Sequence, residues 1–332
     1  MGGRCTCVES LGESSKIEVV GHEQLQQLGG FPSIDKHHKL KSLKEPDGKE
    51  TLEDMIDVPL VENPPVVLEG GVKYTGQWRG HAREGCGALE RPDGGRYEGE
   101  FVKGMAHGYG RLSHVNGDTY DGHWHEDRAQ GRGTFTHEDG SSYTGQWHQD
   151  MQQGHGVEVW ADGSKFEGTY WCSKKHGHGK FYWAEGSAYE GEFQENRIHG
   201  YGEYKWADGR RYIGQWSRTH MHGAGEMSWG DGRKYIGGYS EDRKHGEGIF
   251  TWADGREYNG QWHEGAQHGL GRYKNVRGEV RQGEWQEGRR VRWLDAVGAN
   301  GQEVADSGKD LAAEGETAGA TNAELQTALG PV

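Results

Sequence analysis

Glycine recurs along this chain with a fixed period of 23 residues. Nine of the ten periodic glycines lie in an aromatic-x-Gly-x-aromatic frame, and in the last frame Arg281 replaces the first aromatic residue. The ten are Gly76, Gly99, Gly122, Gly145, Gly168, Gly191, Gly214, Gly237, Gly260 and Gly283. A period of this length indicates a repeat array, in which one supersecondary unit is copied and stacked on its neighbours. Such arrays present surfaces and seldom build a catalytic pocket.

The composition supports an array rather than one compact core. Only 32% of the 332 residues are hydrophobic, while glycine alone supplies 59. A single core of this chain length would need more aliphatic residues. All 13 Trp and 15 Tyr lie between Tyr74 and Trp293, so the apolar material is aromatic and confined to the periodic segment.

The net charge of −14 is spread unevenly along the chain. Residues 1–73 carry −5 and residues 295–332 carry −6, which leaves the periodic segment near −3 with 16 of the 19 His. No basic stripe suited to nucleic acid is present, so we expect no nucleic-acid partner. No apolar run approaches about 18 residues, and none follows the initiator Met, so we expect neither a membrane span nor a secretory signal.

Two short patterns alternate within each period. In the first, Tyr-x-Gly-x-Trp, the three named residues share one face of a strand because side chains alternate. The second, Gly-x-Gly-x-aromatic, as in Gly131 to Phe135, follows the same period of two. Asp-Gly, as in Asp93-Gly94, separates the second pattern from the next Tyr, and Asp-Gly between alternating runs predicts a hairpin. Each repeat is therefore predicted to contain two antiparallel strands.

The parity of the strands selects the turn. A two-residue loop at Asp93-Gly94 would place the aromatic face of one strand opposite the polar face of the other. A three-residue loop, Pro92–Gly94 with Gly94 at positive φ, instead places all large apolar residues on one face, with rings over glycines. The predicted pairs are Tyr97 with Leu89, Gly99 with Gly87 and Phe101 with Gly85.

These motifs resemble the MORN repeat (membrane occupation and recognition nexus), whose signature is Tyr-x-Gly-x-Trp, His-Gly-x-Gly and Asp-Gly. The resemblance runs from Tyr74 to Trp285. The departures are local: Glu84, Gln130 and Gln153 replace the His before the paired glycines. The resemblance implies an all-β fold, an elongated, twisted antiparallel sheet of about ten stacked hairpins.

The chain is predicted to divide into three parts. Residues 1–73 form an N-terminal segment and linker with a short helix at 15–28. Residues 74–293 form the repeat array. Residues 294–332 form an acidic tail rich in Ala and Gly, which we expect to be disordered like most of the N-terminal segment.

The N-terminus carries a signal for lipid attachment. Met1 to Thr6 fits the pattern for myristoylation at Gly2, and Cys5 and Cys7 lie close enough for palmitoylation. One acyl chain binds a membrane only marginally, whereas two or three hold firmly. We expect acylation at Gly2, Cys5 and Cys7; the alternative is an unmodified start.

Nothing in the sequence predicts catalysis, a cofactor or a metal. No nucleophile elbow, Walker loop or kinase signature occurs, and the Gly-x-Gly fragments fall inside predicted strands. One repeat position holds a column of histidines, but equivalent residues of adjacent hairpins are about 9.5 Å apart, too far to share a metal ion. A hydrogen bond to backbone or contact with a neighbouring ring is the favoured interpretation of this column. Its members are His176, His199, His222, His245 and His268.

The sequence therefore predicts a non-enzymatic scaffold on the cytoplasmic face of a plasma, cortical or flagellar membrane, or otherwise in the cytoplasm or cytoskeleton. It would present an aromatic sheet to a protein partner, such as the amphipathic helix that the family suggests. A homodimer is a further possibility. The alternatives are a phosphoinositide-binding module, a cytoskeletal or axonemal component and a regulatory subunit of an enzyme. The predicted partner-binding residues are Trp183, Trp206, Trp229 and Trp252, for which packing against the turns is the competing interpretation.

Overall fold

A computed structural model describes residues 58–294, which are β-strands joined by tight turns, with one short 3-10 helix (Glu69–Gly71). The predicted helix at 15–28 and the acidic tail from 295 onward lie outside the described residues. The strands fall into two units, which divide between Lys174 and Lys175. Each unit is described by itself.

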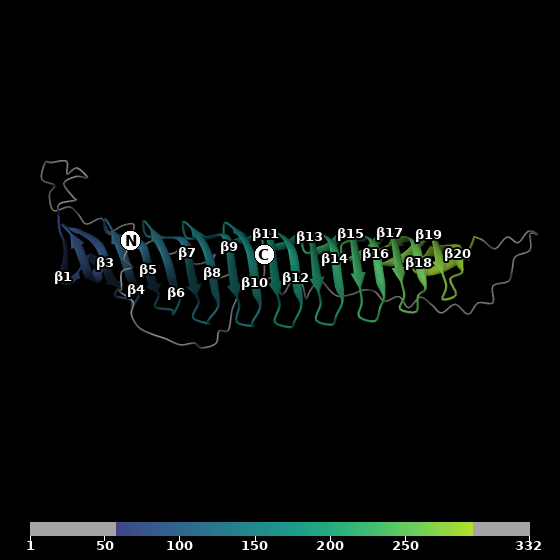
Figure 1. The fold of residues 1–332 in the computed structure, drawn as a ribbon, viewed down its shortest axis with the longest axis horizontal. Helices are drawn as coiled ribbons and strands as arrows, with labels where there is room; N and C mark the ends of the chain where they lie inside the picture. The colour runs from purple at the N-terminus through teal and green to yellow at the C-terminus, as the bar shows by residue number, and fades with distance from the viewer. Residues whose placement is uncertain (1–57, 295–332) are drawn as a thin grey trace, which may run out of the picture. The chain divides into compact units, whose positions relative to one another are not determined.

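The first unit contains ten strands, and each pairs antiparallel with the next in chain order (Figure 1). Its first strand falls inside the segment predicted as a linker and pairs with the first repeat strand through a bulge around Pro64 and Pro65. Proline at a sheet edge removes N–H groups that would pair with another strand. An edge strand can therefore contain prolines, and this is why its sequence resembled a linker. The strands are β1 (Leu60–Val67), β2 (Lys73–Arg79), β3 (Ala82–Glu90), β4 (Arg96–Val102), β5 (Met105–Ser113), β6 (Thr119–His125), β7 (Arg128–Thr136), β8 (Ser142–His148), β9 (Met151–Val159) and β10 (Lys165–Trp171).

The second unit contains eleven strands with the same antiparallel, chain-order pairing (Figure 1). They are β11 (Lys174–Tyr182), β12 (Ala188–Gln194), β13 (Arg197–Lys205), β14 (Arg211–Ser217), β15 (His220–Ser228), β16 (Lys234–Ser240), β17 (Arg243–Thr251), β18 (Glu257–His263), β19 (Ala266–Lys274), β20 (Val280–Gln286) and β21 (Arg289–Trp293). The all-β, stacked-hairpin fold predicted from the sequence is confirmed in both units.

The long loop between repeats has the predicted three residues. Backbone hydrogen bonds join Arg91 N to Gly95 O (2.8 Å) and Gly94 N to Arg91 O (3.0 Å), and Gly94 has φ 97°. The carboxylate of Asp93 accepts the N–H of Gly95 at 2.8 Å, an Asx turn that fixes the loop. All three predicted pairs are present: Leu89 with Tyr97, Gly87 with Gly99 and Gly85 with Phe101.

The short turn inside each repeat is followed by a bulge that the sequence analysis missed. Between two paired positions of β8 and β9, the single residue Gln146 faces the three residues 153–155. Gly154 has φ 70° there, and a Cβ on it would lie 2.0 Å from Gln146 Oε1. That oxygen accepts the backbone N–H of His155 at 2.9 Å. The first glycine of Gly-x-Gly therefore serves a bulge, and the assumed period of two fails at this point.

Aromatic rings fill the core, and several of their polar atoms hydrogen-bond to the backbone. Tyr120 is fully buried and its hydroxyl donates to His123 O at 3.1 Å. Trp124 Nε1 donates to Gly110 O at 2.9 Å. The Tyr120 ring meets Trp124 of its own frame at 5.0 Å and Trp147 of the next repeat at 5.3 Å, both edge-on. Burial raises the pKa of Tyr74, the equivalent residue of the first repeat, to about 12, so the hydroxyl donors stay protonated at neutral pH. Aromatic residues with a polar atom fit these sites better than aliphatic ones.

The periodic glycines leave space for these rings and for the neighbouring strand. A Cβ on Gly191 would lie 2.5 Å from Gly202 Cα and 2.5 Å from the Tyr189 hydroxyl. In the first unit, a Cβ on Gly122 would lie 2.5 Å from Gly133 Cα. The expectation that rings or backbone occupy the space of a side chain is thus confirmed in both units.

Neighbouring repeats are also joined through their short turns. Gln149 and Asp150 both have positive φ (48° and 67°), as in a type I′ turn. The Asp150 N–H donates to Ala129 O at 3.1 Å, and Asp150 Oδ1 accepts the Ala129 N–H at 2.8 Å. Asp127 makes the same pair of bonds with Ala106 in the preceding repeat. Each turn is thus fixed to the start of the strand one repeat earlier.

Candidate binding surface

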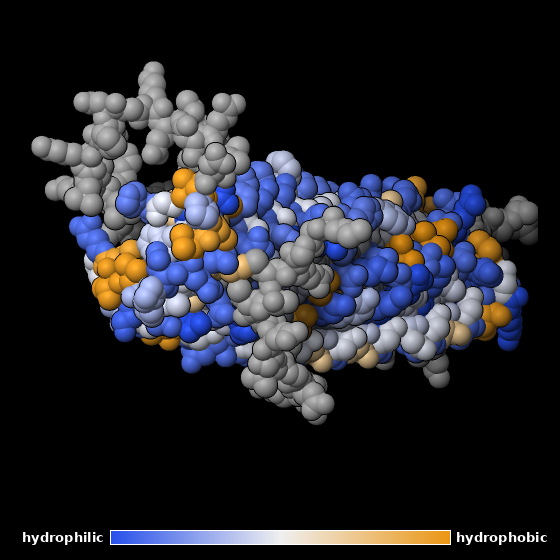
Figure 2. Space-filling model, turned by 60° about the vertical axis from the view of Figure 1, so that its left-hand side comes forward, coloured by the Kyte–Doolittle hydropathy of each residue, from blue (hydrophilic) through white to orange (hydrophobic). Residues whose placement is uncertain are grey.

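The two faces of each sheet carry different kinds of residue. In β6, Tyr120 and Trp124 are buried, whereas His123 and His125 point outward and are exposed. The inner positions are filled by the repeating rings, and the outer positions differ from one repeat to the next. The face seen in Figure 2 is largely hydrophilic, with separate hydrophobic patches. The outer face is therefore where one repeat is chemically distinct from another.

The predicted tryptophan ladder lies at the start of successive long loops. Trp183 and Trp206 are 5% and 9% exposed, and Trp229 and Trp252 are half-buried. The backbone N–H of each of these tryptophans closes its own loop, as the Trp206 N–H does by donating to Arg210 O at 2.9 Å. This burial supports the interpretation that the ladder packs against the turns, while partner binding by the ladder stays a prediction.

Three of these loops share a stacked arrangement of Asp, Arg and Trp. The Arg233 guanidinium lies 5.4 Å from the centre of the Trp229 ring, and its Nε bonds to Asp231 at 2.7 Å. Hydrogen bonds from the backbone N–H and then the side chain of Arg233 lower the pKa of Asp231. The same arrangement recurs at Arg210 with Trp206 and Asp208, and at Arg256 with Trp252 and Asp254.

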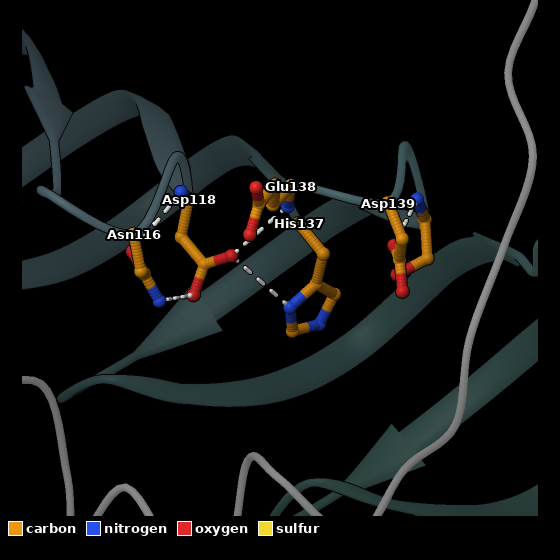
Figure 3. Close-up of polar contacts among 6 residues, drawn as sticks. Asn116, Asp118, His137, Glu138 and Asp139 are labelled. Atoms are coloured by element: carbon orange, nitrogen blue, oxygen red, sulfur yellow. Dashed lines mark hydrogen bonds and ion pairs between the residues drawn. The ribbon is translucent and has the colours of Figure 1, made fainter.

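In the first unit, His114 and His137 stand at two of the ladder positions. Figure 3 shows His137 beside Asp118. Asp118, which is buried, accepts the Glu138 N–H at 3.1 Å and lies 3.5 Å from His137 Nδ1. Desolvation lowers the pKa of His114, and the nearby Asp118 carboxylate offsets part of that shift. The pKa of His114 therefore lies below that of an ordinary histidine.

A groove of about 490 Å³ opens on β7 to β10 of the first unit. Its lining comes from the bulges of β7 and β9, from β8 and from the end of β10, where Trp171 is 61% exposed. No acidic residue lines it. The lining residues are Gln130, Gly131, Arg132, Gln146, Trp147, His148, Gln153, Gly154 and Trp171.

The side-chain oxygens of the groove glutamines are held by the backbone. Gln130 Oε1 accepts the N–H of Gln149 at 3.1 Å, and Gln153 Oε1 accepts the N–H of Cys172 at 3.1 Å. Gln146 Oε1 is held by His155, as described above. With the oxygens occupied, the amide NH₂ groups remain as donors. Gln130 Nε2 lies 3.3 Å from His148 Nδ1; since an amide NH₂ only donates, the ring proton of His148 stays on Nε2.

The sequence analysis did not identify this groove, although two signals pointed to it. Gln130 and Gln153 are two of the three departures from the motif His, and both line the groove. Trp171 follows its frame directly, where other repeats carry residues such as His148 and Gln194. The predicted register places every large apolar residue on one face, so it does not predict an outward tryptophan at Trp171.

The histidine column lies on the outer face, at the bulges. His245, His222 and His268 are exposed, and the His263 ring lies between two members, 5.4 Å from His245 and 5.5 Å from His268. These contacts support the interpretation of neighbouring rings. Among residues 58–294 no cluster of three or more His, Cys, Asp or Glu is arranged to hold a metal ion.

The predicted lipid-attachment residues Gly2, Cys5 and Cys7 lie outside the described residues, so acylation stays a prediction. Within residues 58–294, no helix has the length and apolar character needed to cross a membrane.

Comparison with solved structures gives only weak similarities. The TCP domain of SAS-4 from Drosophila melanogaster, in complex with a proline-rich motif of Ana2, is 13% identical with a TM-score of 0.30, and the match covers 59% of this chain and 97% of that one. The TCP10 domain of CPAP from Danio rerio is 12% identical with a TM-score of 0.23, covering 66% and 96%. Virginiamycin B lyase from Staphylococcus aureus is 11% identical with a TM-score of 0.14, covering 69% and 71%. No curated protein matches the chain.

A family model settles the relationship. The MORN repeat matches nine consecutive segments: residues 74–96, 97–119, 120–142, 143–165, 166–188, 189–210, 212–232, 235–255 and 258–280. The segments begin at or next to the Tyr or Phe that opens each frame, so the family match and the hairpin stacking describe the same unit. This chain belongs to the MORN-repeat family, and its repeats make it a repeat-based binding or scaffold protein.

Proposed function

We propose that the protein is a non-enzymatic scaffold, held on the cytoplasmic face of a membrane by acylation at Gly2, Cys5 and Cys7, and that its repeats bind a protein partner. The observation that supports a scaffold is the difference between the two faces of each sheet. Inner positions repeat and are buried, while outer positions vary at a fixed spacing. A surface of that kind suits an extended or helical partner.

The partner surface is assigned to the outer face rather than to the inner rings. The exposed aromatic side chains supporting this are Tyr109, Trp171, Tyr182 and Tyr201, between 45% and 61% exposed. Rings such as Tyr97 and Tyr212, by contrast, are 0–1% exposed and occupied by packing. The proposed partner-binding surface therefore comprises the outward-facing aromatic residues rather than the whole aromatic sheet.

The membrane part of the proposal is tested by the location of the full-length protein in cell fractions. Gly2→Ala should move the protein from the membrane to the soluble fraction. Cys5→Ser with Cys7→Ser should leave weak, exchanging attachment, because one acyl chain is marginal. Retention of the Gly2→Ala protein would contradict the anchor and favour direct lipid binding by the repeats.

A further inference from the structure

We infer that the groove on β7 to β10 binds an extended, carboxylate-rich segment of a partner protein. This inference rests on the proposed scaffold function and names the chemistry of the partner. The chain as a whole carries 52 Asp and Glu against 38 Lys and Arg, so a groove lined by no acid is a local exception.

The groove offers hydrogen-bond donors. Gln146 and Gln153 present amide NH₂ groups because their oxygens are held by backbone N–H groups at 2.9 and 3.1 Å. His148 presents Nε2–H, since Gln130 occupies its Nδ1. Arg132 adds a guanidinium. An ionised carboxylate accepts hydrogen bonds and donates none, so carboxylates complement these donors.

The groove is long enough for a short extended peptide. Its lining residues come from four consecutive strands. Adjacent strands are about 4.8 Å apart, so the donors on β7 to β9 span about 10 Å, the length of about three residues of extended chain, and Trp171 on β10 extends the lining to about 14 Å. A peptide that crosses the strands therefore meets one or more donors per residue, with Trp171 as an aromatic contact at one end.

The fold does not require glutamine at positions 146 and 153. Glu100 and Glu192 occupy the position of Gln146 in other repeats and accept the same backbone N–H, at 3.3 and 3.0 Å. Glu84 occupies the position of Gln153 and accepts the N–H of Lys103 at 2.8 Å. Glutamate therefore satisfies the bulge as well as glutamine, and packing alone does not require the amides.

The test uses these natural replacements. The full-length protein is titrated into a labelled acetyl-Glu-Glu-Phe-Glu-Glu-amide peptide and, separately, its Gln-Gln-Phe-Gln-Gln counterpart, with binding read by fluorescence anisotropy. The double variant Gln146→Glu with Gln153→Glu keeps both backbone bonds but turns donors into charged acceptors. It should weaken binding of the acidic peptide at least about tenfold. Gln215→Glu makes the same change at an equivalent site that holds the Ala224 N–H at 2.9 Å, and should leave binding unchanged.

Two outcomes would overturn the inference: equal binding of the acidic and glutamine peptides, or undiminished binding by the double variant. Thermal melting of each variant verifies that it folds. Membrane retention of the parent protein reports on the proposed scaffold separately. If the parent is retained on the membrane but does not bind the acidic peptide, the groove assignment is wrong and the anchor stands; if the parent binds the peptide but is not retained, the anchor is wrong and the groove assignment stands.

Discussion

The long loops share one backbone but differ in the side chain at their first position, which is His114 or His137 in two loops of the first unit, Trp160 in another, and tryptophan in most loops of the second unit. In the first unit His114 N bonds to Asp118 O at 2.8 Å, and in the second Trp206 N bonds to Arg210 O at 2.9 Å. Both loops close with a glycine at positive φ, Gly117 at 94° and Gly209 at 88°. The backbone is thus set by the loop residues, and the first position is free to carry either a titrating histidine or a packed tryptophan.

The largest expected effect tests what the two units share. Gly122→Val in the first unit and Gly191→Val in the second each place a Cβ 2.5 Å from the Cα of a facing strand. Backbone cannot yield as a flexible side chain can, so each change should cost about 3 kcal/mol or more. Urea denaturation should give similar losses in both units.

The matched control is Gly163→Ala, where no atom lies within 4 Å of the new Cβ and only the φ of 87° resists it. That change should cost about 1 kcal/mol. If Gly122→Val costs no more than the control, the shared core described here is wrong.

The second effect separates the units. Trp206→Ala with Trp229→Ala removes rings that pack on Tyr204 at 4.5 Å and Phe250 at 5.8 Å. We expect a loss of about 2–4 kcal/mol in the second unit, seen as faster hydrogen exchange there. Unchanged exchange together with lost partner binding would instead assign the ladder to the interface.

A third, smaller effect is the response to acid. The folded-state pKa of His114 is lowered by burial, so the neutral form stabilises the fold. That stability is complete above about pH 6.5 and is lost as pH falls through the depressed folded pKa. His114→Phe should flatten the acid limb of the first unit's stability curve, measured by hydrogen exchange at several pH values. An unchanged acid limb would show that other groups control it.

The smallest effect concerns the cation–π stack. Arg233→Gln removes the positive charge over the Trp229 ring and the ion pair with Asp231. The side chains of Arg233 and Asp231 are both partly exposed. We expect a loss of about 0.5–1 kcal/mol in the melting of the second unit, reduced by salt. A loss as large as that of the tryptophan double variant would mean that the stack, rather than ring packing, holds the loop.

The sequence was sufficient for the hairpin register because parity leaves one loop length that keeps Tyr97 opposite Leu89. It was insufficient for the bulge, since a Gly-x-Gly strand has the same alternating pattern with and without two inserted residues. Gly246 illustrates the missed signal: it stays glycine with φ 70° although nothing would contact its Cβ. A backbone conformation, rather than crowding, requires it.

The groove was hidden for a different reason. Gln130 and Gln153 depart from the motif, but only the fold brings them beside Trp171 to line one groove. Periodicity describes what the repeats share, whereas the residues proposed to bind a partner are those that differ. The tryptophan ladder repeats, and its buried members pack against the turns.

The central claim is that partners bind the outer face while the inner face and the ladder hold the fold. Anisotropy titration of the acidic peptide with the Trp171→Gln protein and with the Trp206→Ala, Trp229→Ala protein tests it directly. Gln194 shows that glutamine is accepted at the position of Trp171. The account predicts that Trp171→Gln weakens peptide binding about tenfold and leaves the melting temperature unchanged. It predicts that the Trp206→Ala, Trp229→Ala protein, measured below its melting temperature, binds the peptide as the parent does. Binding lost in the ladder variant and retained in Trp171→Gln would contradict it.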